Sequence, residues 1–158
     1  MKIGIISDSH GALDRLETAL ENLENGGIRE IIHAGDFALG EIDQVLAKFP
    51  NINFRIAIGN CDVDQEKLER VQKLSNIELV ELLEFELGKR KFSVAHKIAD
   101  LRDSQAEILI SGHTHIPFGK KVGKQLFLNP GSLQDDGGYF ILETKNLAVE
   151  RKLFHQKI

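Results

Sequence analysis

Residues 2–23, KIGIISDSHGALDRLETALENL, join a short run of β-forming residues to a helical pattern. The leucines Leu13, Leu16, Leu20 and Leu23 are three or four residues apart, which is the spacing of one face of an amphipathic helix. A Gly-Gly pair then ends the helical pattern. The segment therefore predicts a buried strand followed by an amphipathic helix.

The same alternation continues through the first half of the chain. Two further β-rich runs, EIIHAG at 30–35 and FRIAIG at 54–59, are each followed by a helical pattern, at 42–49 and 64–74. A strand–helix–strand order predicts right-handed crossovers, and therefore a parallel sheet with helices on its face.

The second half of the chain changes to hairpin patterns. Alternating apolar residues flank a turn at 88–90, and paired strands around a turn are expected at 118–128 and 137–154. The run at 108–112 is a further buried strand, and residues 97–107 form a small helix or loop. Together the two halves predict an α/β fold of two sheets packed face to face, with helices outside.

Length and composition are those of an ordinary folded protein. The 158 residues suffice for a single domain, residues 1–158. A net charge of −4, with one Tyr and no Trp, argues against a stable nucleic-acid complex. No apolar stretch approaches the roughly 18 residues of a membrane span, and the first residues have the pattern of a strand rather than a signal peptide. Cys61 is the single Cys, so no internal disulfide can form, and we expect a cytoplasmic protein without membrane partners.

Five of the expected strands end in side chains that carry oxygen or nitrogen donors. In open α/β sheets, ligands bind beyond the carboxyl ends of the strands. Residues two apart in an extended chain point to the same side, so the two donors after the first strand can converge, as can the two histidines of GHTH. Glycines stand directly before three of the donors and let the backbone approach a ligand closely. The seven donors are Asp8, His10, Asp36, Asn60, His96, His113 and His115.

Each donor alone has a simpler explanation, such as a helix cap, a turn residue or a hydrogen-bonded histidine. Chance would scatter such residues over both ends of a sheet, so the joint pattern favours a metal site. Carboxylate, imidazole and amide donors suit Mn²⁺, Fe²⁺, Zn²⁺, Co²⁺ or Ni²⁺ rather than a structural thiolate site or an all-oxygen calcium site. Seven donors are too many for one open ion and suit two ions about 3.5–4 Å apart.

The donors lie in motifs that follow one another along the chain: SDSHG (7–11), HAGD (33–36), GNCD (59–62), the lone His96, GHTH (112–115) and NPGS (129–132). In order and register these motifs resemble those of the calcineurin-like metallophosphoesterases, and of their small phosphodiesterase branch in particular. The resemblance spans Asp8 to Ser132. It implies a four-layer α/β/β/α sandwich in a single domain, with a dinuclear metal site.

The resemblance also implies which donors hold which ion. By motif, the first ion is held by Asp8, His10, Asp36 and His115. The second ion is held by Asp36, Asn60, His96 and His113, with Asp36 as the bridging carboxylate. Mn²⁺ is the first candidate, and Fe²⁺, Ni²⁺, Zn²⁺ and Co²⁺ are alternatives.

The activity implied is hydrolysis of a phosphodiester by a hydroxide that the two ions activate. Asp36, Asn60 and His113 would act in catalysis through the ions and this hydroxide. A phosphomonoesterase or nucleotidase on the same ions remains open. So does a non-catalytic protein-binding scaffold, since the retromer scaffold subunit has this fold. The expected ligand is a small phosphoester, and a homodimer or higher homo-oligomer is left open.

Two departures from the family pattern bear on the substrate. Lys97 follows the lone histidine where the family usually has glycine, and the connection from His96 to His113 is short, which favours an open cleft. Cys61 stands where the wider superfamily often has a histidine that assists the leaving group.

Three residues beside the donors are candidates for a supporting role: His33, Cys61 and Asp62. His33 either holds a ligand in place or is a structural strand histidine. Cys61 is expected to be a small packed side chain rather than a nucleophile. Asp62 either orients a ligand or caps the following helix, and the cap is the preferred interpretation. NPGS is expected to form a supporting turn, and His155 to lie at the surface.

Overall fold

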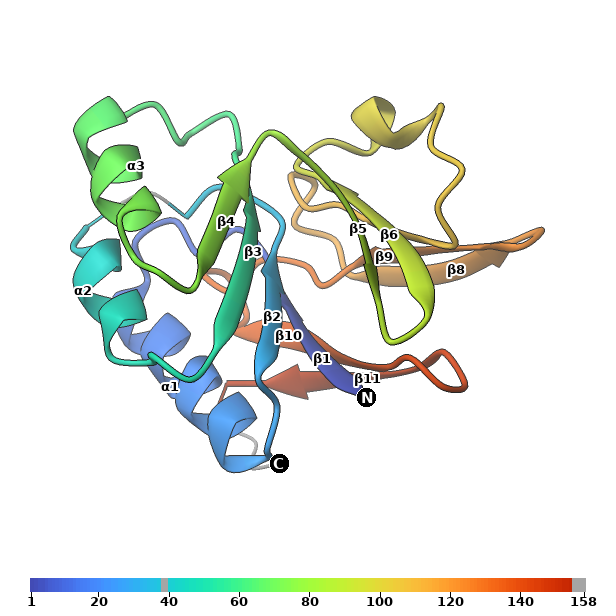
Figure 1. Ribbon diagram of the computed structural model, residues 1–158, viewed down its shortest axis with the longest axis horizontal. Helices are drawn as coiled ribbons and strands as arrows, with labels where there is room; N and C mark the ends of the chain where they lie inside the picture. The colour runs from blue at the N-terminus through green and yellow to red at the C-terminus, as the bar shows by residue number, and fades with distance from the viewer. Residues whose placement is uncertain (38–39, 155–158) are drawn as a thin grey trace.

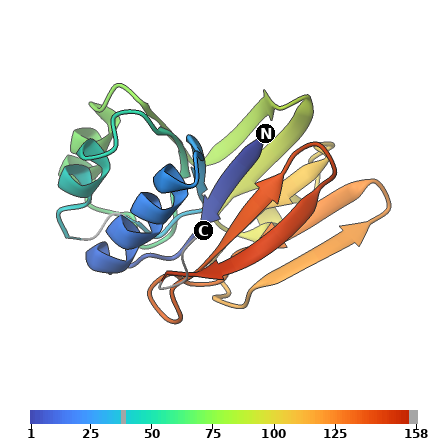
Figure 2. The same ribbon diagram turned by 90° about the horizontal axis from the view of Figure 1, so that it is seen from below.

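The computed structural model describes residues 1–37 and 40–154, which form two β-sheets packed face to face and three α-helices on the outer face of one sheet (Figures 1 and 2). The first sheet has the order β11-β10-β1-β2-β3-β4, and the second β5-β6-β7-β9-β8. The strands of the first sheet are β1 (Lys2–Ile6), β2 (Glu30–His33), β3 (Asn53–Ala57), β4 (Ile77–Val80), β10 (Gly138–Glu143) and β11 (Ala148–Leu153). Those of the second are β5 (Leu82–Leu87), β6 (Arg90–Ala95), β7 (Ile108–Ile110), β8 (Phe118–Val122) and β9 (Gln125–Asn129).

The predicted parallel half is present in the first sheet. Strands β1 to β4 run parallel, with Gly4 opposite Ile31 and Ile31 opposite Phe54. β10 pairs antiparallel with the free edge of β1 and carries β11 outside it. The chain returns between the parallel strands through three helices: α1 (Leu13–Asn25), α2 (Ile42–Ala47) and α3 (Gln65–Gln72).

Two apolar cores lie on the two faces of the first sheet, and β1 contributes to both. Ile6 belongs to the core under the helices, whereas Ile3 and Ile5 belong to the core between the sheets. The predicted helix face packs into the first of these cores, where Leu16 and Leu20 are fully buried. Because both of its faces are covered, β1 is a nearly continuous apolar run rather than an alternating one.

The outer layer on the second sheet is thin. The 3₁₀ helix η1 (Ile98–Leu101) lies within the segment predicted as a small helix or loop, and its Leu101 packs with Ala95 and Leu109 of the sheet. The four-layer α/β/β/α order is therefore present, with its last layer reduced to one helical turn. β4 is an addition that the sequence patterns did not predict.

None of the helices in the described part of the chain combines the length and the apolar character that crossing a bilayer requires. The predicted surface position of His155 falls outside the described residues.

Candidate metal centre

The seven predicted donors follow the carboxyl ends of strands from both sheets. Asp8 and His10 follow β1, Asp36 follows β2, Asn60 follows β3, His96 follows β6, and His113 and His115 follow β7. Strands β1 to β3 are parallel in one sheet, and β6 and β7 are parallel in the other. The donors of each sheet therefore lie at one edge, and the distances below show that the two edges adjoin.

The backbone at this place is in an uncommon conformation. Five of the seven donors have a positive φ: Asp8 (50°), His10 (40°), Asp36 (57°), His113 (69°) and His115 (60°). Among the other non-glycine residues that the structure describes, only Lys89 and Leu147 share it. A left-handed residue with a side chain costs roughly 1–2 kcal/mol, and such strain persists chiefly at functional sites.

Two buried carboxylates form the middle of the centre. Asp8 Oδ1 lies 3.2 Å from His115 Nε2, and Asp36 Oδ2 lies 3.2 Å from His96 Nε2. His10 Nε2 is 3.5 Å from an oxygen of each carboxylate. Asp8 and Asp36 are 0% and 3% exposed, so folding has placed two acidic groups side by side away from water. Such an arrangement needs positive charge to offset it.

The remaining two donors lie at the solvent side of the same place. His113 Nδ1 is 3.1 Å from Asn60 Oδ1, and the His113 ring lies edge-on to that of His96 with centroids 5.1 Å apart. Both Asn60 and His113 are exposed. The structure therefore brings all seven donors to one place, with His10, His96 and His115 against the buried carboxylates and with His113 and Asn60 beside His96.

The donors suit a divalent cation. Asp8, His10 and His115 each offer a ligand atom within 4.8 Å of the others, and so do Asp8, Asp36 and His96. The buried atoms Asp8 Oδ1 and His96 Nε2 lie 3.2 Å from His115 Nε2 and Asp36 Oδ2, but within the described residues neither atom makes a contact with the geometry of a hydrogen bond. A buried polar atom without a partner is costly, and a bound cation would supply one to each.

The electrostatics keep Asp36 ionised. Burial alone would raise its pKa, but the neighbouring His96 imidazole and the Cys61 N–H, which donates to Asp36 Oδ1 over 2.9 Å, outweigh burial. The pKa of Asp36 therefore lies well below its usual range. Burial would likewise lower the pKa of His96, but the Asp36 carboxylate and the Ala34 carbonyl, 2.7 Å from His96 Nδ1, raise it.

Asp62 holds the backbone of two donor loops. Its buried carboxylate accepts hydrogen bonds from the backbone N–H groups of Asp36 (2.9 Å), Phe37 (2.8 Å) and Gly59 (2.7 Å). The preferred prediction, that Asp62 caps the following helix, is wrong: the N-cap of α3 is Asp64, whose side chain accepts from the Lys67 N–H. The Asp62 carboxylate is occupied by three backbone N–H groups of the donor loops, so Asp64, two residues later, caps the helix.

The NPGS motif braces the two other donor loops. Asn129 Nδ2 donates to the Gly112 carbonyl over 2.8 Å, and Ser132 Oγ donates to the Asp8 carbonyl over 3.1 Å. Gly112 must be glycine here, because a Cβ would overlap Ser7 Oγ and lie 2.5 Å from Asp8 Oδ2. The motif thus supports the site without contributing to the group of donors.

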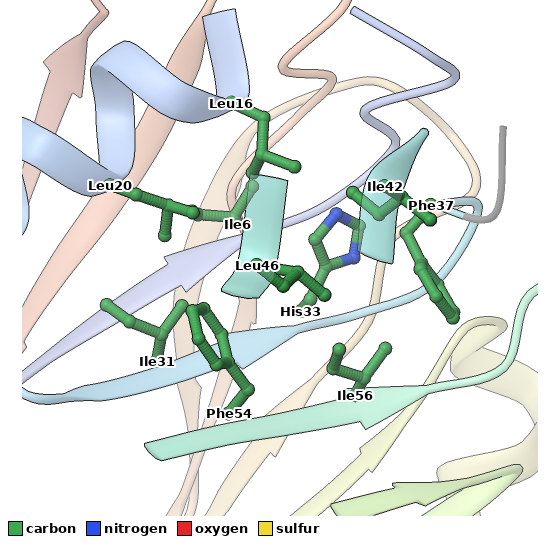
Figure 3. A pocket seen from close by; sticks show the side chains of 10 residues that line it. All are labelled: Ile6, Leu16, Leu20, Ile31, His33, Phe37, Ile42, Leu46, Phe54 and Ile56. Atoms are coloured by element: carbon green, nitrogen blue, oxygen red, sulfur yellow. The ribbon is translucent and has the colours of Figure 1, made fainter. Parts of the chain in front are cut away.

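His33 lies behind the centre rather than in it. Its Nδ1 accepts the Gly35 N–H over 3.2 Å, so the ring proton is on Nε2 and faces Ser9 Oγ at 3.0 Å. His33 and nine apolar side chains line a small cavity of about 10 Å³, and Figure 3 shows the His33 ring among them. Burial, followed by the nearby charge of His96, lowers the pKa of His33 to about 3. His33 is thus a neutral part of the core that holds Ser9, the residue between two donors.

Cys61 is at the mouth of the site. The residue is exposed, so the prediction of a packed side chain is wrong: the loop after Gly59 places the thiol beside the donors, with its sulfur within 4.8 Å of ligand atoms of His10 and Asp36. Desolvation and the charge of Asp36 raise the pKa of the thiol. A thiol that stays protonated is a poor nucleophile.

Two features of the site escaped the sequence patterns. Asp135 accepts a hydrogen bond from His115 Nδ1 over 2.8 Å, and no local motif announces this contact. A pocket of about 210 Å³ opens beside Asn60 and His96, and it is also lined by Ile58, Gly59, Glu81, Lys97 and Asp100. Lys97, the departure from the family pattern, therefore lines a pocket that adjoins the donors.

Comparison with known proteins agrees with this geometry. Residues 1–147 match the family model of the calcineurin-like phosphoesterase superfamily domain. The phosphodiesterase MJ0936 of Methanocaldococcus jannaschii is 30% identical over 141 residues, which cover 83% of each chain.

Solved structures extend the similarity to the whole fold. The structure of an archaeal phosphodiesterase superposes with a TM-score of 0.84 at 25% identity, covering 96% of this chain and 99% of that one. The phosphoesterase YfcE from E. coli superposes with a TM-score of 0.75 at 20% identity, covering 98% of this chain and 100% of that one, and so shares the fold.

Proposed function

Because the chain belongs to the calcineurin-like phosphoesterase superfamily, we propose that it is a phosphodiesterase that works with two divalent transition-metal ions. The observation that carries the proposal is the meeting of seven oxygen and nitrogen donors from five strand ends at one place. Asp8, His10, Asp36 and His115 would hold one ion. Asp36, Asn60, His96 and His113 would hold the other, and Mn²⁺ is the first candidate for both.

When bound, the two ions would supply Lewis-acid activation of water and charge neutralisation at the phosphoryl oxygens. The chain's own residues prepare the place for this chemistry. Asp8 and Asp36 contribute two buried negative charges, and the low pKa of Asp36 keeps it a carboxylate at neutral pH. An amide at position 36 would leave positive charge in excess.

The exposed donors mark the side from which substrate approaches. Asn60 and the buried His96 line the 210 Å³ pocket, and His113 contacts Asn60, so a phosphoester in that pocket would lie against the donors. Cys61 lies beside His10 and Asp36, but its raised pKa keeps the thiol protonated and a poor nucleophile, so the proposal takes water as the attacking group. The open pocket and the similarity to proteins named phosphodiesterases favour a small diester.

The test is an activity panel on metal-free protein reloaded with Mn²⁺, Fe²⁺, Co²⁺, Ni²⁺ or Zn²⁺. We expect two equivalents of metal to bind and bis(p-nitrophenyl) phosphate to be hydrolysed faster than p-nitrophenyl phosphate. Faster turnover of the monoester would favour the phosphomonoesterase alternative. Absence of both metal binding and turnover would favour a scaffold. A cytoplasmic location and a homo-oligomer stay predictions.

A further inference from the structure

His115 spans the gap between the metal centre and an acidic side chain outside it. Its Nε2 lies 3.2 Å from Asp8 Oδ1, while its Nδ1 lies 2.8 Å from Asp135 Oδ2. The His115 side chain is 33% exposed and comes from a loop residue with a positive φ. Core packing therefore holds the ring only in part. The ring also contacts that of His10, with 3.2 Å between the two Nε2 atoms, and Asp135 is the group outside the metal centre that orients it.

Asp135 is itself held in place although its side chain is 55% exposed. Its N–H donates to Ser132 Oγ over 3.2 Å. Its carbonyl accepts a hydrogen bond from Arg15 of α1 over 3.1 Å, and the same guanidinium group also donates to the Gln134 carbonyl. The turn after NPGS is thus fastened to the first helix, and Asp135 presents its carboxylate from a fixed backbone.

The contact decides where the proton of a neutral His115 lies. Both ring nitrogens face a carboxylate, which can only accept a hydrogen bond. The contact of Nδ1 with Asp135 is a hydrogen bond of 2.8 Å, whereas Nε2 lies 3.2 Å from Asp8 Oδ1, which makes no hydrogen bond, and 3.2 Å from His10 Nε2. This geometry favours the proton on Nδ1, with the lone pair of Nε2 toward the metal centre. His96 has the same arrangement, because its Nδ1 faces the Ala34 carbonyl at 2.7 Å. The difference is that the partner of His96 is backbone, whereas the partner of His115 is a side chain that mutation can remove.

We propose that Asp135 is a positioning residue, which fixes the orientation and the Nδ1–H tautomer of His115 and so strengthens the binding of the one ion that His115 holds. The part that concerns the ion rests on the proposed function. A carboxylate behind a ligating imidazole makes it a better ligand, and removal of such a partner typically costs about 10- to 100-fold in metal affinity. His115 belongs to one group of donors, so the loss should fall on one ion.

The first experiment needs no metal. Long-range ¹H–¹⁵N spectra of metal-free protein at about pH 8, where histidines are ordinarily neutral, report the tautomer of each ring. We expect His115 of the wild type to be the Nδ1–H form and Asp135→Ala to shift it to a mixture with the Nε2–H form. Asp135→Asn keeps an oxygen acceptor but loses the charge, and should fall between the two.

The second experiment titrates the same proteins with Mn²⁺ and resolves the two dissociation constants. We expect Asp135→Ala to raise one constant by about 10- to 100-fold and to leave the other unchanged. Asp136→Ala is the matched control, because Asp136 is the adjacent carboxylate and its partners are Arg151 and the Gly138 N–H rather than a donor.

An unchanged His115 tautomer in Asp135→Ala would overturn the proposal, and so would equal losses at both ions or losses matched by Asp136→Ala. The wild type could also bind no Mn²⁺ while the Asp135→Ala variant still shows a changed His115 tautomer. That result would overturn the proposed function and the effect of Asp135 on metal affinity, but it would support the orientation of His115 by Asp135.

Discussion

The centre has two parts that are built differently. Asp8, Asp36 and His96 form what we term the buried half, with at most 3% of each residue exposed. Asn60, His113 and His115 form the open half, in which the first two are exposed and the third is partly so. The seventh donor, His10, lies between the halves, because it is 3.5 Å from both carboxylates and 3.2 Å from His115.

The two halves are also held by different groups. In the buried half, backbone atoms from other loops fix the side chains: the Ala34 carbonyl faces His96, and the Cys61 and His113 N–H groups donate to Asp36 and Asp8. In the open half, side chains hold side chains, as Asp135 holds His115. Changes that remove the groups behind the buried half should therefore affect folding as well as catalysis, whereas those around the open half should affect binding and turnover alone.

The largest effect is expected from Asp36→Asn, which removes the negative charge of a buried-half side chain and keeps its shape. The amide oxygen can still accept the Cys61 N–H, so the fold should persist. The loss of one negative charge should lower turnover of bis(p-nitrophenyl) phosphate by about 10²- to 10³-fold. Circular dichroism should show a folded protein, and Asp103→Asn, at a carboxylate that is 97% exposed, is the control. Turnover like that of the wild type would contradict the role of Asp36.

The next largest effect is expected from Asp62→Ala, which removes the hydrogen bonds that support the buried half and leaves all seven metal-donor side chains unchanged. Three backbone N–H groups would lose a buried charged acceptor, so the free energy of unfolding should fall by about 3 kcal/mol in urea titrations of metal-free protein. Asp64→Ala, which removes only the cap of α3, should cost about 1 kcal/mol. Equal losses in the two variants would show that the buried half does not depend on this support.

The sequence predicted the parts of the molecule that depend on local patterns. The spacing of Leu13, Leu16, Leu20 and Leu23 identified α1, and the apolar runs identified β1 to β3. Both patterns depend only on residues that are close together in the sequence. The family resemblance is confirmed by the match over residues 1–147. The sequence also predicted that the donors at the strand ends lie close together, since parallel strands bring their carboxyl ends to one edge of the sheet.

What the sequence did not predict depends on contacts through space. β4 is a four-residue edge strand in which only Leu79 is buried, so its sequence shows no alternation of apolar and polar residues. The choice between Asp62 and Asp64 as helix cap was decided by three amides that come from other loops. Asp135 contacts His115 from a turn that Ser132 and Arg15 of α1 hold in place. None of these contacts leaves a local signal.

A smaller effect, dependent on pH, is expected from His33 behind the buried half. The pKa of His33 is about 3 in the folded protein and about 6.5 when unfolded, so the unfolded state binds a proton first as the pH falls. The stability that neutral His33 contributes should be present above about pH 6.5 and should decline toward pH 3. Between about pH 7.5 and 5 the loss should be about 2 kcal/mol.

The matched measurement uses His33→Asn, whose side chain does not titrate and can still accept the Gly35 N–H. The gap in unfolding free energy between wild type and variant should narrow by about 2 kcal/mol over this pH range. If the unfolding free energies of the two proteins fell in parallel with pH, His33 would not be the group whose protonation destabilises the protein in acid.

The smallest effect is expected from Cys61→Ala, at the mouth of the open half. The backbone N–H that donates to Asp36 is kept, and the lost thiol is exposed and protonated. The free energy of unfolding should change by no more than about 0.5 kcal/mol, and turnover by no more than about threefold. Asn60→Ala, which removes a predicted donor next to it, should lower turnover far more. If Cys61→Ala retained both metals but lost all turnover, the thiol would have to take part in the reaction, and the open half would supply the nucleophile rather than admit the substrate.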